Sequence, residues 1–110
     1  MPKITLWSCL RDALNSYNDG QLFSRKQILY KIKEAYPDVL SESSFDLYRL
    51  MLTRIKVLEW ISKGVYKKLQ HFPESLTTSK AHKLEIHYQW EKDTWADWFV
   101  DNIEDRIKLL

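Results

Sequence analysis

Six basic side chains lie within twenty consecutive residues, and this density predicts a surface that binds a polyanion. Residues 49–68 contain a single acidic residue, Glu59. Charge is also distributed unevenly along the whole chain. Residues 1–72 hold 12 Lys/Arg and 7 Asp/Glu, whereas residues 73–110 hold 5 Lys/Arg and 8 Asp/Glu. A local positive excess is typical of nucleic-acid-binding surfaces, although a solvated helix face has the same composition. The six basic residues are Arg49, Arg54, Lys56, Lys63, Lys67 and Lys68.

Catalytic and metal-binding templates find no match, so we expect neither enzyme activity nor a cofactor. The last two of the three histidines, His82 and His87, are five residues apart, whereas a helical zinc motif needs four. Cys9, the only cysteine, lies in an apolar-periodic segment, where a core role is expected. Two glycines in the whole chain are too few for a glycine-rich phosphate loop.

Length and composition indicate one small domain with an appendage. A hydrophobic content of 45% and an aromatic content of 14% are enough for a core without disulfides. We expect a domain over residues 1–73, a polar linker over 74–83 and an appended C-terminal helix over 84–110. No apolar run approaches the roughly 20 residues of a membrane span, and the N-terminus lacks a long apolar stretch. A cytoplasmic protein without membrane contact is therefore expected.

Two helices are predicted in the first third of the chain. Apolar residues at three-to-four spacing indicate a helix over about residues 5–17. Ser24 and Gln27 form the sequence pattern of a capping box, so a second helix should begin just after Ser24. That helix should end near Tyr36, because Pro37 disfavours helical geometry in the residue before it.

A third helix and a hairpin follow. Ser41 or Ser43 can cap the helix. At about Val57 the repeat in residue character changes from the helical period to the two-residue alternation of a strand. Lys63 with Gly64 is the expected two-residue turn. The register expected from this turn pairs Ser62 with Val65, Ile61 with Tyr66, Trp60 with Lys67, Glu59 with Lys68 and Leu58 with Leu69.

The C-terminal part combines an apolar stripe with an acidic one. Residues 84–90 alternate like a strand, yet they equally continue a helix back to Ser79, so both readings stand. A helix is expected from about Glu91. Its apolar face either packs on the chain's own core, forms a homodimer interface or binds a protein partner. The apolar residues are Trp95, Trp98, Phe99, Ile103 and Ile107, and the acidic stripe is Asp93, Asp97, Asp101 and Asp105.

Three helices followed directly by a basic hairpin resemble the winged-helix form of the helix-turn-helix. The resemblance covers residues 5–73 and rests on "FSRKQIL", "SFDLYRLMLTRIKVLEWI" and "GVYKKL". The Tyr-Arg pair in the third helix and the Gly-Val-Tyr after the turn are similar to small bacteriophage winged-helix proteins. Leu50, an apolar residue near the exposed face of the third helix, departs from the pattern of a base-reading helix.

The resemblance implies a mainly α fold with a small β-hairpin wing, and a double-stranded DNA partner. In that family the third helix enters the major groove and the wing contacts the backbone. It thus implies a small transcriptional regulator or DNA-associated accessory factor of phage or mobile-element type. The alternative is a winged-helix protein–protein module that binds through Leu50's face or the C-terminal helix. The implied DNA contacts are Ser24, Arg25, Lys26, Ser43, Ser44, Arg49, Thr53, Arg54, Lys63, Lys67 and Lys68, with Arg49 as the base reader.

Overall fold

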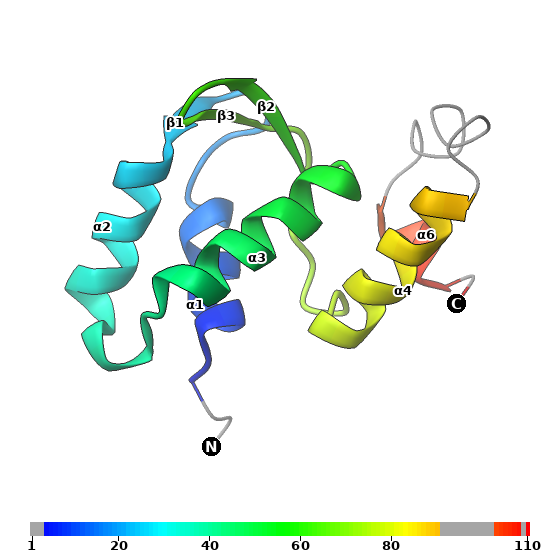
Figure 1. Ribbon diagram of the computed structural model, residues 1–110, viewed down its shortest axis with the longest axis horizontal. Coiled ribbons are helices and arrows are strands. Elements are labelled where there is room, and N and C mark those ends of the chain that lie inside the picture. Colours follow the sequence, from blue (N-terminus) through cyan, green and yellow to red (C-terminus); the bar gives the residue numbers. More distant parts are fainter. Residues whose placement is uncertain (1–3, 91–102, 109) are drawn as a thin grey trace.

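The computed structural model describes residues 4–90, 103–108 and 110 (Figure 1). In this part the chain is mainly helical and carries one small three-stranded antiparallel sheet. The sheet lies at one end of α1, α2 and α3, and α4 and α6 lie beside the end of α3 (Figure 1). The elements are α1 (Leu6–Asn15), β1 (Leu22–Ser24), α2 (Arg25–Ala35), η1 (Pro37–Val39), α3 (Glu42–Arg54), β2 (Leu58–Ser62), β3 (Val65–Lys68), α4 (Thr78–Trp90) and α6 (Ile103–Lys108).

The predicted capping box begins α2. The Ser24 side chain accepts a hydrogen bond from the Gln27 backbone N–H, and the Gln27 side chain accepts one from the Ser24 backbone N–H. These two reciprocal bonds satisfy donors that the first helical turn would leave free. The helix ends at Ala35, two residues before Pro37, as the proline predicts. Local sequence alone therefore sets both ends of α2.

The α3 helix begins after Ser41, whose side chain accepts a hydrogen bond from the Ser44 backbone N–H. Of the two predicted caps, Ser41 is the one used. At the other end, Lys56 has a φ of 66°, in the left-handed region that favours glycine. The Lys56 backbone N–H then binds Thr53 O, and the Val57 N–H binds Leu52 O, so the chain turns directly into the sheet.

The sheet has the order β1-β3-β2. Strand β1 was not predicted, because three residues between a turn and a helix cap carry no period of their own. The Lys63-Gly64 turn and the Ser62–Val65 pair are confirmed. The register beyond them is wrong by one residue, since an irregularity between Trp60 and Ser62 leaves Ile61 without a partner. The observed pairs are Trp60–Tyr66, Glu59–Lys67 and Leu58–Lys68.

The core extends past residue 73, so the predicted linker over 74–83 is wrong from residue 78 onward, where α4 begins. Leu76, Ala81 and Leu84 are fully buried in the same cluster as the core residues of α1, α2 and α3. The Trp7 indole N–H in α1 donates to Leu76 O at 2.8 Å. Residues 84–90, which the sequence left open between strand and helix, belong to α4. The segment packs on α3 because its apolar side chains are needed to close the core.

The described end of the chain packs on the same core. Ile103 and Ile107 of α6 are buried, and the Ile103 backbone N–H donates to the Gln70 side chain at 2.9 Å. Their prediction as a dimer seam is wrong for these two residues, because burial in their own chain removes them from the surface. Asp105 of the acidic stripe is exposed. The other predicted residues of both stripes, Asp93, Trp95, Asp97, Trp98, Phe99 and Asp101, lie outside the described residues.

Candidate nucleic-acid interface

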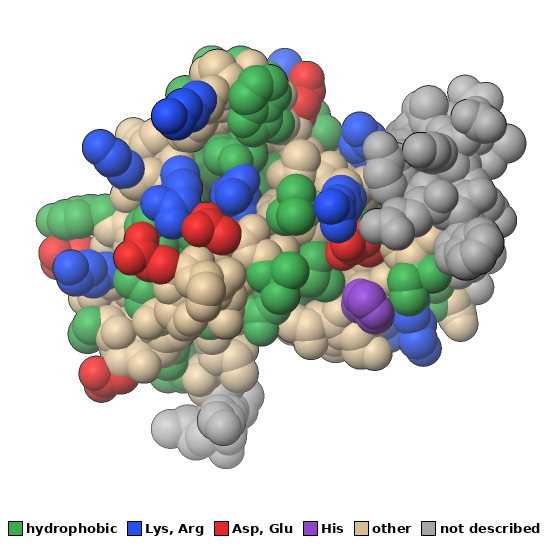
Figure 2. All heavy atoms as spheres, in the orientation of Figure 1, with side chains coloured by type: hydrophobic (Ala, Val, Ile, Leu, Met, Phe, Trp, Pro, Cys, Tyr) green, Lys and Arg blue, Asp and Glu red, His purple; other side chains and the backbone are tan. Residues whose placement is uncertain are grey.

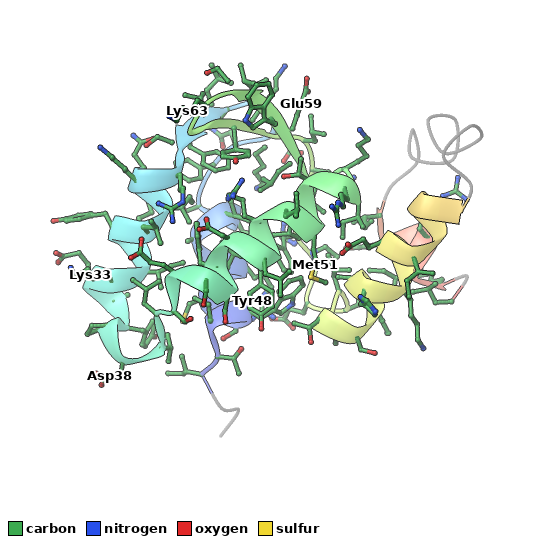
Figure 3. The ribbon with its side chains drawn as sticks, in the orientation of Figure 1. Lys33, Asp38, Tyr48, Met51, Glu59 and Lys63 are labelled. Atoms are coloured by element: carbon green, nitrogen blue, oxygen red, sulfur yellow. The ribbon has the colours of Figure 1, made fainter. Side chains whose placement is uncertain are left out.

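The start of α2 lies against the turn of the β2–β3 hairpin. The Arg25 backbone N–H donates to Gly64 O at 2.9 Å, which places two consecutive basic residues of α2 beside the turn. Lys26 and Lys63 are both exposed there. Figure 3 shows Lys63 at the hairpin turn and Lys33 at the far end of α2. The first turn of a helix also carries the positive end of the helix dipole, which favours anions.

Arg25 and Arg49 share one carboxylate, that of Asp46 on α3. The Arg25 guanidinium binds both Asp46 oxygens, with Nε–Oδ1 at 2.8 Å and Nη2–Oδ2 at 3.0 Å. Arg49 Nε donates to the same Oδ1 at 3.3 Å. These hydrogen bonds, that of Arg25 first, hold the pKa of Asp46 below its usual range, and the same bond raises the pKa of Arg25. Asp46 therefore joins α2 to α3 and stays ionised at neutral pH.

Arg49, the predicted base reader, lies between α3 and the sheet. Its Nη1 donates to the Tyr66 hydroxyl, and its guanidinium lies 5.1 Å from the centre of the Tyr66 ring. The side chain is therefore held by Asp46 on one side and Tyr66 on the other. A held guanidinium loses little conformational entropy on binding, but part of its hydrogen-bonding capacity is already used.

Two of the predicted hairpin contacts do not lie on the exposed surface beside α3. Lys68 is only 3% exposed, and its ammonium donates to Tyr17 O at 2.7 Å, so its prediction as a phosphate contact is wrong. Lys67 lies directly between Leu22 and Glu59 in the sheet. Because side chains alternate along a strand, Lys67 points to the opposite sheet face from Tyr66 and therefore away from Arg49.

The remaining predicted DNA contacts lie near the two ends of α3. Near the N-terminus, Ser43 is exposed and its hydroxyl lies 3.2 Å from that of Ser41, while Ser44 is half-buried. Near the C-terminus, the Thr53 hydroxyl donates to Arg49 O at 2.8 Å. Arg54 binds Glu85 of α4 and keeps 37% of its side chain exposed. Every predicted arginine contact thus has an acidic partner within the chain.

Exposed apolar residues on the same side of the molecule were largely missed by sequence reasoning. Leu50 was noted, but Leu47, one turn earlier on α3, is 57% exposed. Trp60 is also 57% exposed and shares a sheet face with Tyr66, the residue that binds Arg49. The spacing of Leu47 and Leu50 on one helix face was readable from the sequence, whereas the pairing of Trp60 with Tyr66 depends on the bulge in β2.

The described residues offer little for metal or nucleophile chemistry. No group of three or more His, Cys, Asp or Glu side chains in this part of the chain is arranged to hold a metal ion. Burial raises the pKa of the Cys9 thiol, which favours the unreactive protonated form. None of the helices in the described ranges is long and apolar enough to cross a membrane.

Comparison with known proteins identifies no relative. No family model, no curated protein and no solved structure matches this chain. The interface is therefore interpreted from its own geometry.

Proposed function

We propose that this chain is a winged-helix protein that binds double-stranded DNA, as a small transcriptional regulator or DNA-associated accessory factor of phage or mobile-element type. The winged-helix assignment is supported by the order α1, β1, α2, α3, β2, β3, in which a short turn joins α2 to α3 and a hairpin follows α3 directly. The hairpin is the wing in this proposal, and α3 is the helix that enters the major groove.

The observation that carries the DNA proposal is the meeting of three elements at Arg25. Its backbone N–H binds the hairpin turn at Gly64, and its guanidinium binds Asp46 of α3. The start of α2, the hairpin turn and α3 are therefore fixed next to one another. Lys26 and Lys63 add exposed positive charge at this place. A surface that combines a helix start, a basic turn and an exposed helix face suits a DNA groove and its flanking phosphates.

The side chains divide into positioning and reading roles. Lys26 and Lys63 contact phosphates, since both are exposed and lie near the positive end of the α2 dipole. Arg49 reads a base with the part of its guanidinium that Asp46 and Tyr66 leave free. Ser43 and Thr53 contribute polar contacts from the two ends of α3.

Fluorescence anisotropy with a labelled DNA duplex at several salt concentrations tests the proposal. The log–log salt slope should correspond to several phosphates, at about 0.9 per phosphate. Lys26→Ala and Lys63→Ala should each reduce the magnitude of the slope by the amount expected for one phosphate contact. Lys33→Ala, at the far end of α2, should leave the slope unchanged. Arg49→Ala should cost about 1–3 kcal/mol at one base position. An absence of binding by the full chain even at low salt rules out the DNA function.

A second function, a protein–protein module, is favoured by one specific observation. The middle of the exposed face of α3 is apolar, with Leu47 57% and Leu50 40% exposed. A helix that reads DNA bases carries mostly polar and basic residues at its centre, whereas paired leucines are typical of helix–helix contacts.

A further inference from the structure

Four residues of α3 form a narrow exposed stripe along the helix. Ser43, Leu47, Leu50 and Arg54 follow each other at intervals of four, three and four residues, the spacing of the contact positions in paired helices. Ser43, Leu47 and Leu50 are exposed, and Arg54 is partly exposed. The opposite face of α3 carries the core residues Phe45 and Leu52. The stripe therefore points away from the chain's own core.

The spacing of the stripe is the same in both directions along the helix, so its two leucines can pack on the same two leucines of a second copy. Reversing the direction of the helix about the midpoint between Leu47 and Leu50 exchanges these two leucines and exchanges Ser43 with Arg54. We propose that α3 binds α3 of a second copy of this chain, antiparallel and related by a two-fold axis. Leu47 of each copy then packs on Leu50 of the other. A two-fold interface needs this self-complementarity, because the same patch serves on both sides.

Charges along α3 favour the same antiparallel arrangement. Figure 2 shows acidic side chains with basic neighbours over the first half of α3, hydrophobic ones over its middle, and a basic side chain next to an acidic one at its end. The first turn contains Glu42, whose side chain is 68% exposed, and the helix ends with Arg54 followed by Lys56. In the antiparallel pair, Glu42 of one copy faces the segment between Arg54 and Lys56 of the other. A parallel pair would instead place like charges side by side.

This proposal rests on the protein–protein function above and names its partner. It also bears on DNA, because a second copy that covers α3 keeps that helix out of the major groove. Self-association and α3-mediated DNA binding would then compete. Measuring self-association without DNA separates failure of this proposal from failure of the DNA function.

Sedimentation equilibrium of the full chain, over a range reaching millimolar concentration, is the test. Leu50→Lys places two like charges at the centre of the pair and should leave the protein monomeric. Leu22→Lys is the matched control, since Leu22 is 55% exposed and lies in the sheet beside Lys67, on the face turned away from Arg49. Circular dichroism of each variant confirms that the chain is folded.

A charge pair at the ends of the stripe sharpens the test. Ser43→Glu adds a carboxylate opposite Arg54 of the second copy at two symmetric places, where it adds to the ion pair that Arg54 already makes with Glu85. An exposed ion pair raises an association constant by a factor of about 1.4 to 5, so the two symmetric pairs should raise it about 2- to 30-fold. Ser43→Arg should lower it. A wild-type chain that stays monomeric throughout, or a dimer that Leu50→Lys leaves unchanged, overturns the proposal.

Discussion

Arg25 at the start of α2 and Asp46 in the second turn of α3 are joined by two charged hydrogen bonds, of 2.8 and 3.0 Å. The residues are twenty-one positions apart, and their contact fixes the angle between the two helices next to the hairpin turn. Both side chains are partly exposed, at 30% and 39%, so water screens the pair and limits its contribution to stability.

The Arg25–Asp46 pair should make stability depend on pH. Because the pKa of Asp46 is lowered in the folded state, the unfolded chain binds the proton more readily, and stability rises with pH. The contribution is complete above the unfolded pKa of about 3.9 and is lost as the pH falls through the folded pKa. Asp46→Asn should therefore lower the free energy of unfolding by about 1 kcal/mol at pH 7, and by less near pH 3.

Urea unfolding at several pH values measures this difference. Glu34→Gln is the control, because Glu34 is an exposed carboxylate of α2 and its replacement makes the same change in net charge. If the difference in the free energy of unfolding between Asp46→Asn and the wild type stays constant from pH 7 to pH 3, the Arg25–Asp46 pair is not the source of the pH dependence.

Lys68 should act on stability, and its neighbour Lys67 should not. Removing the Lys68 ammonium leaves the buried Tyr17 carbonyl without its donor, so Lys68→Ala should lower the free energy of unfolding by about 1–3 kcal/mol. Lys67→Ala, on the outer face of the sheet, should change it by no more than about 0.5 kcal/mol. Chemical denaturation of the two variants gives the comparison directly. Equal effects would mean that Lys68 is not engaged as described.

Lys56 should be replaceable by glycine with a gain in stability. Its φ of 66° brings the side chain close to the following carbonyl, at a cost of about 1–2 kcal/mol that glycine does not have. Lys56→Gly should therefore raise the free energy of unfolding by up to about 1 kcal/mol, after the larger entropy of glycine in the unfolded chain. Lys56→Ala keeps the Cβ and removes the same charge, so it should show no comparable gain. Thermal melts of both variants decide the point.

A fragment of residues 1–73 should be much less stable than the full chain. It lacks Leu76 and Leu84, both fully buried, and burial of a leucine contributes about 1.5–3 kcal/mol. It also leaves the Trp7 indole N–H without its acceptor. Since small domains have only about 5–15 kcal/mol in total, the fragment should melt broadly or remain partly unfolded by circular dichroism. A fragment that melts at the temperature of the full chain would restore the boundary predicted at residue 73.

Local sequence patterns located most of the helices. The capping box at Ser24 and the proline at 37 act within a few residues of where they stand, so the ends of α2 could be predicted from sequence. Strand β1 could not, because its three residues are ordered only by pairing with β3, more than forty positions later. The hairpin register failed for a related reason, since a bulge changes which residues face each other without changing the turn.

By itself the sequence determined where charge and apolar residues are concentrated, because composition and periodicity are properties of neighbouring positions. Only the tertiary structure decided which of those charged side chains remain exposed and unpaired, and so able to bind a partner. Arg25, Arg49 and Arg54 are paired by Asp46 and Glu85, and Lys68 is buried, although all four look alike as basic residues in the sequence. The physical reason is that ion pairs and burial join residues distant in the chain, and only the packing of α2, α3, α4 and the sheet brings them together.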